Sequence, residues 1–342
     1  MDSVRRQSGL SLVELMIAML LSLLLMLGVM QLFLSSHKSY IASTALSRLQ
    51  DSARLAMDYI GYDLRNAGYR GECLASVNAP VALGGDERFD LNVAIKGWEA
   101  EEKLPDWPRS LRTEKIEGTD SILIKHAALS AGVHADVDIP ETAMRIAMTQ
   151  VHDEAADSNI VLSSILGCDL FRSGAVSKTS IAKVNEEPLS RSYKPEITRL
   201  LIAQGNQYYL RKGADGLPSL WRKRWKSELH GYSEELVEGI HDLKFDYGIG
   251  QGSGEYRAVG SGDFVGASSV RNWNDVVAVR VRLLVLGSEI NVTEDDQVYD
   301  RSKGLVCGKG ERACSSADSI EIPQRRLAHA FTSTVSLRNR LP

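Results

Sequence analysis

The start of the chain divides into a short polar segment and a long apolar run. Between Leu15 and Ser36 no residue is charged, and Leu, Met, Ile, Val, Ala and Phe dominate. A run of this length can cross a bilayer as one helix. Arg5 and Arg6 precede it, and short flanks rich in Arg stay cytoplasmic, so we expect one membrane span with the rest of the chain on the outer side.

The helical pattern continues beyond the apolar run. Apolar residues recur at spacings of three and four, at Ile41, Ala45, Leu49, Ala53, Ala56, Met57, Ile60 and Leu64. Gly68 follows where a C-terminal cap is expected, which predicts a helix end near Ala67. A helix from Leu10 to Ala67 would be about 85 Å long, with about 30 Å of it in the bilayer. The stripe on its outer half must pack on another element.

After the helix, short runs rich in β-forming residues alternate with turn residues. In Val276 to Leu286, the odd-numbered Val and Leu residues share one face and Arg280 and Arg282 lie on the other, which is typical of an antiparallel strand with one buried face. Further strands are predicted at Ser121 to Lys125, Ile160 to Ser163, Ile197 to Ala203, Tyr208 to Lys212, Leu220 to Trp225, Leu236 to Tyr247 and His329 to Leu337. Gly205-Asn206, between two of them, is predicted to form a hairpin turn.

Two connections are predicted to lack regular structure. Residues 68–118 are rich in Gly and Pro and contain Trp98 and Trp107, which indicates a long connection held by packed aromatic side chains. Residues 248–266 contain many glycines and are expected to form a flexible loop. The GxGxG pattern in this loop is a weak nucleotide motif, because no helix start follows it.

The composition is that of an ordinary globular protein with no basic excess. The chain has 342 residues, 44% of them hydrophobic, and a formal net charge of -4. A nucleic-acid partner is therefore not expected. Four cations, at Arg222, Lys223, Arg224 and Lys226, alternate with Trp221 and Trp225. They could stack on nucleic acid, but a solvated strand face with snorkelling side chains explains them as well and is preferred.

The four cysteines, Cys73, Cys168, Cys307 and Cys314, are even in number, as expected for a protein exported to an oxidising compartment. No CxxC pair is present, so neither a zinc site nor any other metal or cofactor is expected. Three pairings are possible. We prefer Cys307 with Cys314, because closing so short a loop around Gly308 to Gly310 has little entropic cost, and this leaves Cys73 with Cys168.

The residues before the apolar run resemble a prepilin processing site. A secretory signal peptide would require a small-residue cleavage site after the apolar run, and none follows it. Instead, QSG/LSLVEL at Gln7 to Leu15 is similar to the site at which prepilin peptidase cuts after Gly, here Gly9, and the new N-terminus, here Leu10, is methylated. The resemblance makes Glu14 the fifth mature residue, which in type IV pilins pairs with the N-terminal amine of a neighbouring subunit. The alternative is that Glu14 only complements the dipole of the helix start.

Several later segments resemble the PilW-type minor pilins. They are DLRNAGYRGEC from Asp63, LVEGIHDLKFDYGI from Leu236, NWNDVVAVRVRLLV from Asn272 and TSTVSLRNR from Thr332. The resemblance implies a type IV pilin-like α+β fold, with a long helix packed on an antiparallel sheet. It divides the chain into a leader (1–9), a transmembrane helix (10–36), a periplasmic amphipathic helix (37–67) and a globular sheet domain (68–342).

The same resemblance implies a role and a location. The chain would be a minor pilin that helps to initiate pilus assembly in a tip or priming complex. Its partners would be other minor pilins, the major pilin, a tip adhesin of the PilC/PilY type and prepilin peptidase. It would cross the inner membrane once, with its C-terminal domain in the periplasm, and later sit at the pilus tip on the cell surface.

Two other functions are compatible with a membrane-anchored exported domain. A J-like pseudopilin of a type II secretion system shares the cleavage site and the architecture. An exported enzyme is less well supported, because the chain contains no GxSxG, HExxH, Walker loop or CxxC, and its histidines are scattered. His230 and His241 are interpreted as surface or satisfied core residues, and no catalytic residue is predicted.

Overall fold

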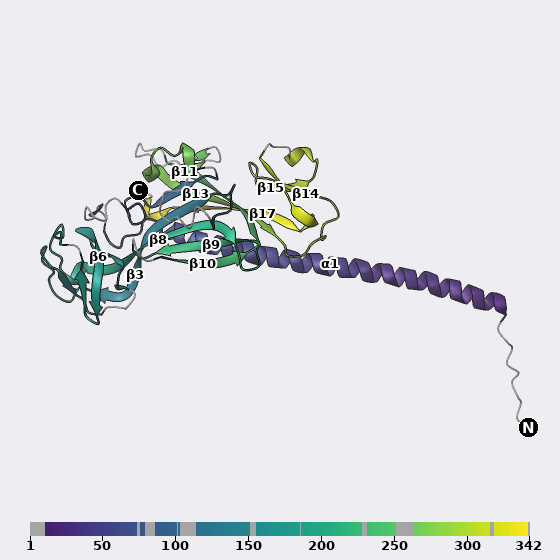
Figure 1. Ribbon diagram of the computed structural model, residues 1–342, viewed down its shortest axis with the longest axis horizontal. Coiled ribbons are helices and arrows are strands. Elements are labelled where there is room, and N and C mark those ends of the chain that lie inside the picture. The colour runs from purple at the N-terminus through teal and green to yellow at the C-terminus, as the bar shows by residue number, and fades with distance from the viewer. Residues whose placement is uncertain are drawn as a thin grey trace, which may run out of the picture.

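One long helix, α1 (Leu12–Asn66), carries three sheets on its outer half (Figure 1). The computed structural model describes residues 11–73, 76–78, 86–100, 102, 114–150, 155–184, 186–227, 231–250, 263–314 and 318–340. The N-terminal half of α1 extends away from the sheets, and the predicted α+β architecture is confirmed. The helix ends one residue before the predicted end. Gly68 then takes a φ of +74°, which a residue without a Cβ adopts easily, and its N–H donates to the Lys125 carbonyl.

The outer half of α1 buries the predicted apolar stripe. Its buried residues are Ala45, Leu49, Ala53, Ala56, Ile60, Gly61, Asp63 and Leu64. Most of them follow the spacing of three and four that gives a helix one apolar face. Ile41 and Met57, also expected in the stripe, are half-buried. The stripe therefore begins near Ala45, well beyond the apolar run.

The largest sheet contains ten of the described strands. They are β1 (Val77–Asn78), β2 (Ile95–Trp98), β3 (Ser121–His134), β4 (Arg145–Ala147), β5 (Asn159–Ser164), β6 (Gly167–Ser177), β7 (Ser180–Lys183), β8 (Thr198–Lys212), β9 (Pro218–Trp225) and β10 (Gly231–Glu238). The order is β10-β9-β8-β5-β6-β7-β4; β3 also pairs with β8, β2 with β3, and β1 with β6. Only the β1–β6 pair is parallel. The sheet extends beyond the end of α1 to the part around β6 (Figure 1).

The predicted hairpin turn at Gly205-Asn206 is wrong, because β8 runs through both residues. Gly205 pairs with Lys125 on one side and Trp225 on the other. A Cβ at Gly205 would lie 2.7 Å from the carbonyl oxygen of Arg88, so the glycine permits a close backbone contact rather than a turn. The turn between β8 and β9 comes later, at residues 213–217.

A second sheet lies against α1 and contains the clearest sequence signal. Its order is β12 (Phe264–Val265), β11 (Ile240–Ile249), β13 (Val276–Leu286) and β17 (Ala328–Ser336). The bounds of β13 are those predicted. The predicted strand from Leu236 to Tyr247 is instead two strands, β10 and β11, in different sheets. Gly239, with a φ of +80°, separates them.

A third, smaller sheet was not predicted. It has the order β15 (Leu305–Gly308), β14 (Gln297–Asp300) and β16 (Ser319–Glu321). Its core contacts Leu284 and Leu286 of β13. The second face of β13 was expected to be exposed to solvent. At Leu284 and Leu286 it is instead covered by the third sheet. Short 3₁₀ helices complete the chain: η2 (Pro195–Ile197), η4 (Ala267–Ser269), η5 (Trp273–Asp275), η6 (Arg312–Cys314), η7 (Pro323–Arg325) and η8 (Arg338–Arg340).

The long connections are only partly regular. Trp98 ends β2 and is buried, as expected of an aromatic anchor. Trp107 and residues 251–262 of the glycine-rich loop lie outside the described residues.

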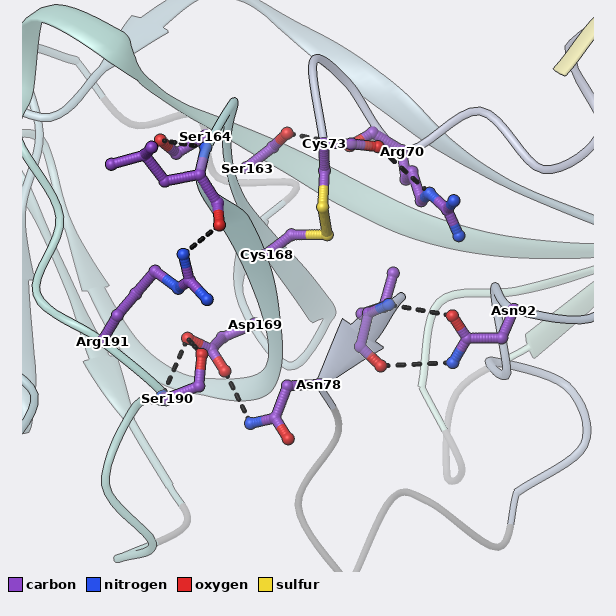
Figure 2. The surroundings of a disulfide bond; sticks show 12 residues. Arg70, Cys73, Asn78, Asn92, Ser163, Ser164, Cys168, Asp169, Ser190 and Arg191 are labelled. Carbon is purple, nitrogen blue, oxygen red and sulfur yellow. Dashed lines mark hydrogen bonds between the residues drawn. A yellow bond between two sulfur atoms is a disulfide. The ribbon is translucent and has the colours of Figure 1, made fainter. Parts of the chain in front are cut away.

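The four cysteines form two disulfides, one between distant parts of the chain and one across a short loop. Cys73, just after α1, is bonded to Cys168 at the start of β6, and Cys307 is bonded to Cys314. This is the pairing preferred from the sequence. Figure 2 shows that the first bond lies beside Asp169, whose carboxylate accepts hydrogen bonds from Asn78 and Ser190. The bond closes a span of 95 residues and ties the end of α1 to the distal part of the large sheet.

Candidate functional site

The start of α1 is a capping box formed by Ser11 and Glu14. The Ser11 hydroxyl accepts a hydrogen bond from the Val13 N–H at 3.3 Å, and the Ser11 N–H donates to Glu14 Oε2 at 3.0 Å. The box satisfies backbone donors that the first helical turn leaves free. The Glu14 carboxylate is thereby held at the helix start, three residues from Ser11. Gly9 and Leu10, the predicted cleavage and methylation residues, lie outside the described residues.

The helix beyond this cap is apolar and uncovered. Every large apolar side chain from Leu12 to Leu34 is at least 50% exposed. The helix is long and apolar enough to cross a membrane. Each Å² of apolar surface left in water costs about 25 cal/mol, so a bilayer or other apolar helices must cover this surface.

Glu14 is the only acidic residue of α1 before Asp51. A carboxylate within an apolar segment is costly unless a cation or a set of donors accompanies it. One of its oxygens accepts the Ser11 N–H, and the group can accept further donors. The arrangement therefore places one negative charge at the inner end of a helix that has no other charged residue before Lys38.

The opposite end of α1 is fixed by a buried polar cluster around Asp63, which is 2% exposed. Asp63 Oδ2 accepts hydrogen bonds from Tyr208 Oη at 2.7 Å and Asn206 Nδ2 at 2.8 Å, both on β8. His126 Nε2 lies 3.4 Å from Oδ1, and an Arg222 nitrogen lies 4.0 Å from Oδ2. Burial alone would raise the pKa of Asp63, but hydrogen bonds from His126 and Tyr208 and the nearby charges hold the pKa below its usual value.

The basic and aromatic residues of β9 are occupied within the chain. Arg222 is 9% exposed and bonds to Glu234 at 2.8 Å, so the expectation of a solvated strand face is wrong for this residue. Lys223 lies 4.6 Å from the ring centroid of Trp225, and Arg211 lies 4.5 Å from that of Trp221. These rings stack on cations of the same chain, which leaves less of them to contact nucleic acid.

Among the described residues, no group of three or more His, Cys, Asp or Glu side chains could hold a metal ion. His241 is half-buried, and burial together with the charge of Arg326 lowers its pKa to about 4. Its Nε2 is buried without a hydrogen-bond partner in the described part of the chain, so of the two alternatives, a surface or a satisfied core residue, the second is wrong. His230 lies outside that part.

A second buried carboxylate, Asp120, lines a cavity of about 420 Å³ beside β11. Its Oδ2 accepts the Phe245 N–H at 3.0 Å, but burial raises its pKa to about 6. The folded state therefore holds its proton to a higher pH than the unfolded state, and the free energy of unfolding falls as pH rises from about 4 to 6.

Replacing Asp120 with Asn should remove this pH dependence and keep an acceptor for the Phe245 N–H. We compare the free energy of unfolding of Asp120→Asn with that of the wild type. This difference should favour the variant by about 2 kcal/mol more at pH 8 than at pH 4.5. Urea unfolding at both pH values measures the difference. An equal effect at the two pH values would contradict the raised pKa.

Comparisons with known proteins find family matches in the N-terminal part and in the C-terminal part of the chain. Residues 207–339 match the family model of the type IV pilus-assembly protein W, PilW, and residues 4–30 match the prokaryotic N-terminal methylation motif. No curated protein matches the chain. Among solved structures, the chain is similar to a type IV-like pilin from Thermus thermophilus, with 10% identity, a TM-score of 0.36 and coverage of 86% of this chain and 99% of that chain. The two family matches include the capping box and all of the second and third sheets.

Proposed function

We propose that the chain, which matches the PilW family model over residues 207–339 and the N-terminal methylation motif over residues 4–30, is a minor pilin that helps to initiate type IV pilus assembly as part of a priming complex at the pilus tip. One observation supports this proposal most. The sheets cover only the outer half of α1, so the inner half, with Glu14 at its start, is free to pack against other helices.

The proposal includes processing and topology. Prepilin peptidase would cut after Gly9, and Leu10 would be methylated. Arg5 and Arg6 would stay on the cytoplasmic side of the inner membrane, and the sheets would fold in the periplasm. Two disulfides in the sheet region support an oxidising compartment. Other minor pilins, the major pilin and an adhesin of the PilC/PilY type would be its partners.

Glu14 would act by pairing with the free amine of a neighbouring subunit. Charges attract more strongly in weakly hydrated surroundings than in water, so the pair would guide the stacking of apolar helices. The capping box supports this role, because it holds the carboxylate at the helix end where a neighbour's N-terminus would arrive.

Two substitutions separate the charge of Glu14 from its capping role. Glu14→Gln keeps a side chain that can complete the box, whereas Glu14→Ala removes both charge and cap. We expect both variants to be cut and inserted, and to reduce the number of surface pili about tenfold, equivalent to about 1.4 kcal/mol of lost pairing. Pili are counted by electron microscopy at matched protein level.

Normal piliation in Glu14→Gln with loss in Glu14→Ala would show that only the cap matters. Normal piliation in both would remove Glu14 from the assembly mechanism. Ser22→Ala, in the same exposed part of α1, serves as the control, since its hydroxyl donates only to the Met19 carbonyl of its own helix.

A further inference from the structure

A groove of about 360 Å³ lies where α1 emerges from the sheets. On one side it is lined by residues 45, 48, 49, 51 and 52 of α1, and on the other by residues 215, 217, 238–239 and 286–289. Leu49, Leu217 and Leu286 give it an apolar lining, and an ion pair of 2.9 Å between Arg48 and Glu289 crosses from the helix to the sheets.

The rim of this groove is acidic. Asp51, Asp215, Glu238 and Glu289 line it with Arg48 as the one cation, four carboxylates against one guanidinium, which is a net charge of -3. Arg326, which donates to the Gly287 carbonyl, reduces the excess to -2 without reversing it.

Two of the rim carboxylates are free to bind. Asp51 and Glu238 are exposed, and the carboxylate of neither is bonded to a residue that the structure describes. Glu289 is engaged by Arg48, and Asp215 accepts the Leu217 N–H at 2.8 Å. An apolar lining below free carboxylates suits the side chain of a Lys or Arg, whose methylene groups pack on Leu while the charged end meets Asp or Glu.

Membrane lipid does not fit this groove. Arg48 lies twelve residues beyond Ser36, or about 18 Å further along the helix, which is out of reach of the headgroups. The negative rim would also repel anionic headgroups. A subunit anchored in the same membrane, in contrast, presents its own helix at this height.

The helix of this chain shows what such a subunit offers. Between Glu14 and Asp51 it has no acidic residue, and beyond the apolar run it carries His37 and Lys38, with Arg48 further out at the height of the groove. This stretch is apolar and basic where the groove is apolar and acidic. We propose that the groove receives a Lys or Arg side chain from the outer, basic part of the N-terminal helix of a neighbouring pilin subunit.

The inference rests on the proposed function and names one contact within it. A photo-reactive amino acid at Ser288, an exposed residue of the groove, is introduced into the full-length chain in its native membrane. After irradiation, the attached peptide is identified by mass spectrometry. We expect a peptide from the N-terminal helix of a pilin, this chain or another, with a Lys or Arg in the part of that helix beyond its apolar run.

Charge variants test the chemistry of the contact. Asp51→Lys with Glu238→Lys should reduce the cross-link about tenfold, and Asp51→Asn with Glu238→Gln, which preserves shape, should reduce it by a smaller factor. The matched control is Asp58→Lys with Glu186→Lys, which changes the charge equally at exposed positions outside the groove and should leave the yield unchanged.

A cross-link to lipid or to a protein without a pilin helix would overturn the inference, as would a yield that the groove variants do not change. These outcomes can be distinguished from a failure of the proposed function in pilus assembly. The cross-link is measured in membranes with Glu14 intact and needs no extended pili, whereas the Glu14 variants test assembly with the groove intact.

Discussion

Asp63→Ala is expected to lower the free energy of unfolding of the chain by about 3–5 kcal/mol, the usual cost of removing one partner from a buried charged cluster. Tyr208 and Asn206 would lose their acceptor at 2.7 and 2.8 Å, and Arg222 would lose a nearby countercharge. Alanine suits a helix, so the loss would come from the cluster and not from helix propensity. The measurement is urea unfolding of the full-length chain in detergent, followed by circular dichroism.

Asp58 provides the matched control, because it lies on the same helix with its side chain 71% exposed. Asp58→Ala should change the stability by less than about 0.5 kcal/mol, as surface substitutions usually do. If both variants lost the same free energy of unfolding, the buried cluster around Asp63 would not contribute to stability.

The pH dependence of Asp63 has the opposite sign to that of Asp120. The folded pKa of Asp63 is lowered, so its contribution is complete above the unfolded pKa near 3.9 and is lost as pH falls through the folded pKa. The difference in free energy of unfolding between the wild type and Asp63→Ala should therefore become smaller only in strong acid.

This cluster matters for the proposed role because it joins the anchor to the sheets. Asp63 is on α1, Tyr208 and Asn206 are on β8, and His126 is on β3. Cys73, seven residues after the end of α1 at Asn66, forms a covalent link to Cys168 of β6. Together with the packed stripe of α1, these two connections would transmit force between the membrane helix and the sheets.

The sequence predicted those parts of the fold that depend on local pattern. Alternation alone determined the bounds of β13, and the spacing of three and four located the stripe on α1, because both periods follow directly from backbone geometry. The capping box also has a sequence signature, a Ser followed three residues later by Glu before an apolar run, and it gives Glu14 a local role beside those expected from the helix dipole and a neighbouring subunit.

The remaining features depend on contacts between distant residues. Gly205-Asn206 has the composition of a turn, yet the Arg88 carbonyl packs against Gly205 and the Asp63 carboxylate binds Asn206, so the strand continues. The strands of the third sheet have three or four residues, too few to show a period. Asp63 stands within an apolar stripe, and only the structure shows the partners on β8 that make its burial favourable.

The largest expected effect on maturation is at Gly9. The match of residues 4–30 to the N-terminal methylation motif supports cleavage between Gly9 and Leu10, and a peptidase that cuts after glycine has little space for a branched side chain there. The wild-type chain should therefore begin at Leu10 with a methylated amine, and Gly9→Val should remain in the membrane as a precursor that retains residues 1–9. Intact-mass measurement of the membrane form distinguishes the two states.

Gly28→Val is the matched control for this prediction. Gly28 lies in the exposed half of α1, and a Cβ there would meet no atom within 4 Å, so the same substitution should leave cleavage unchanged. Processing of Gly9→Val at Leu10 would show that the glycine does not define the site. A wild-type protein that retains Arg5 and Arg6, or begins after Ser36, would refute the prepilin interpretation itself, because the free amine that Glu14 is proposed to bind in a neighbouring subunit would then not exist at Leu10.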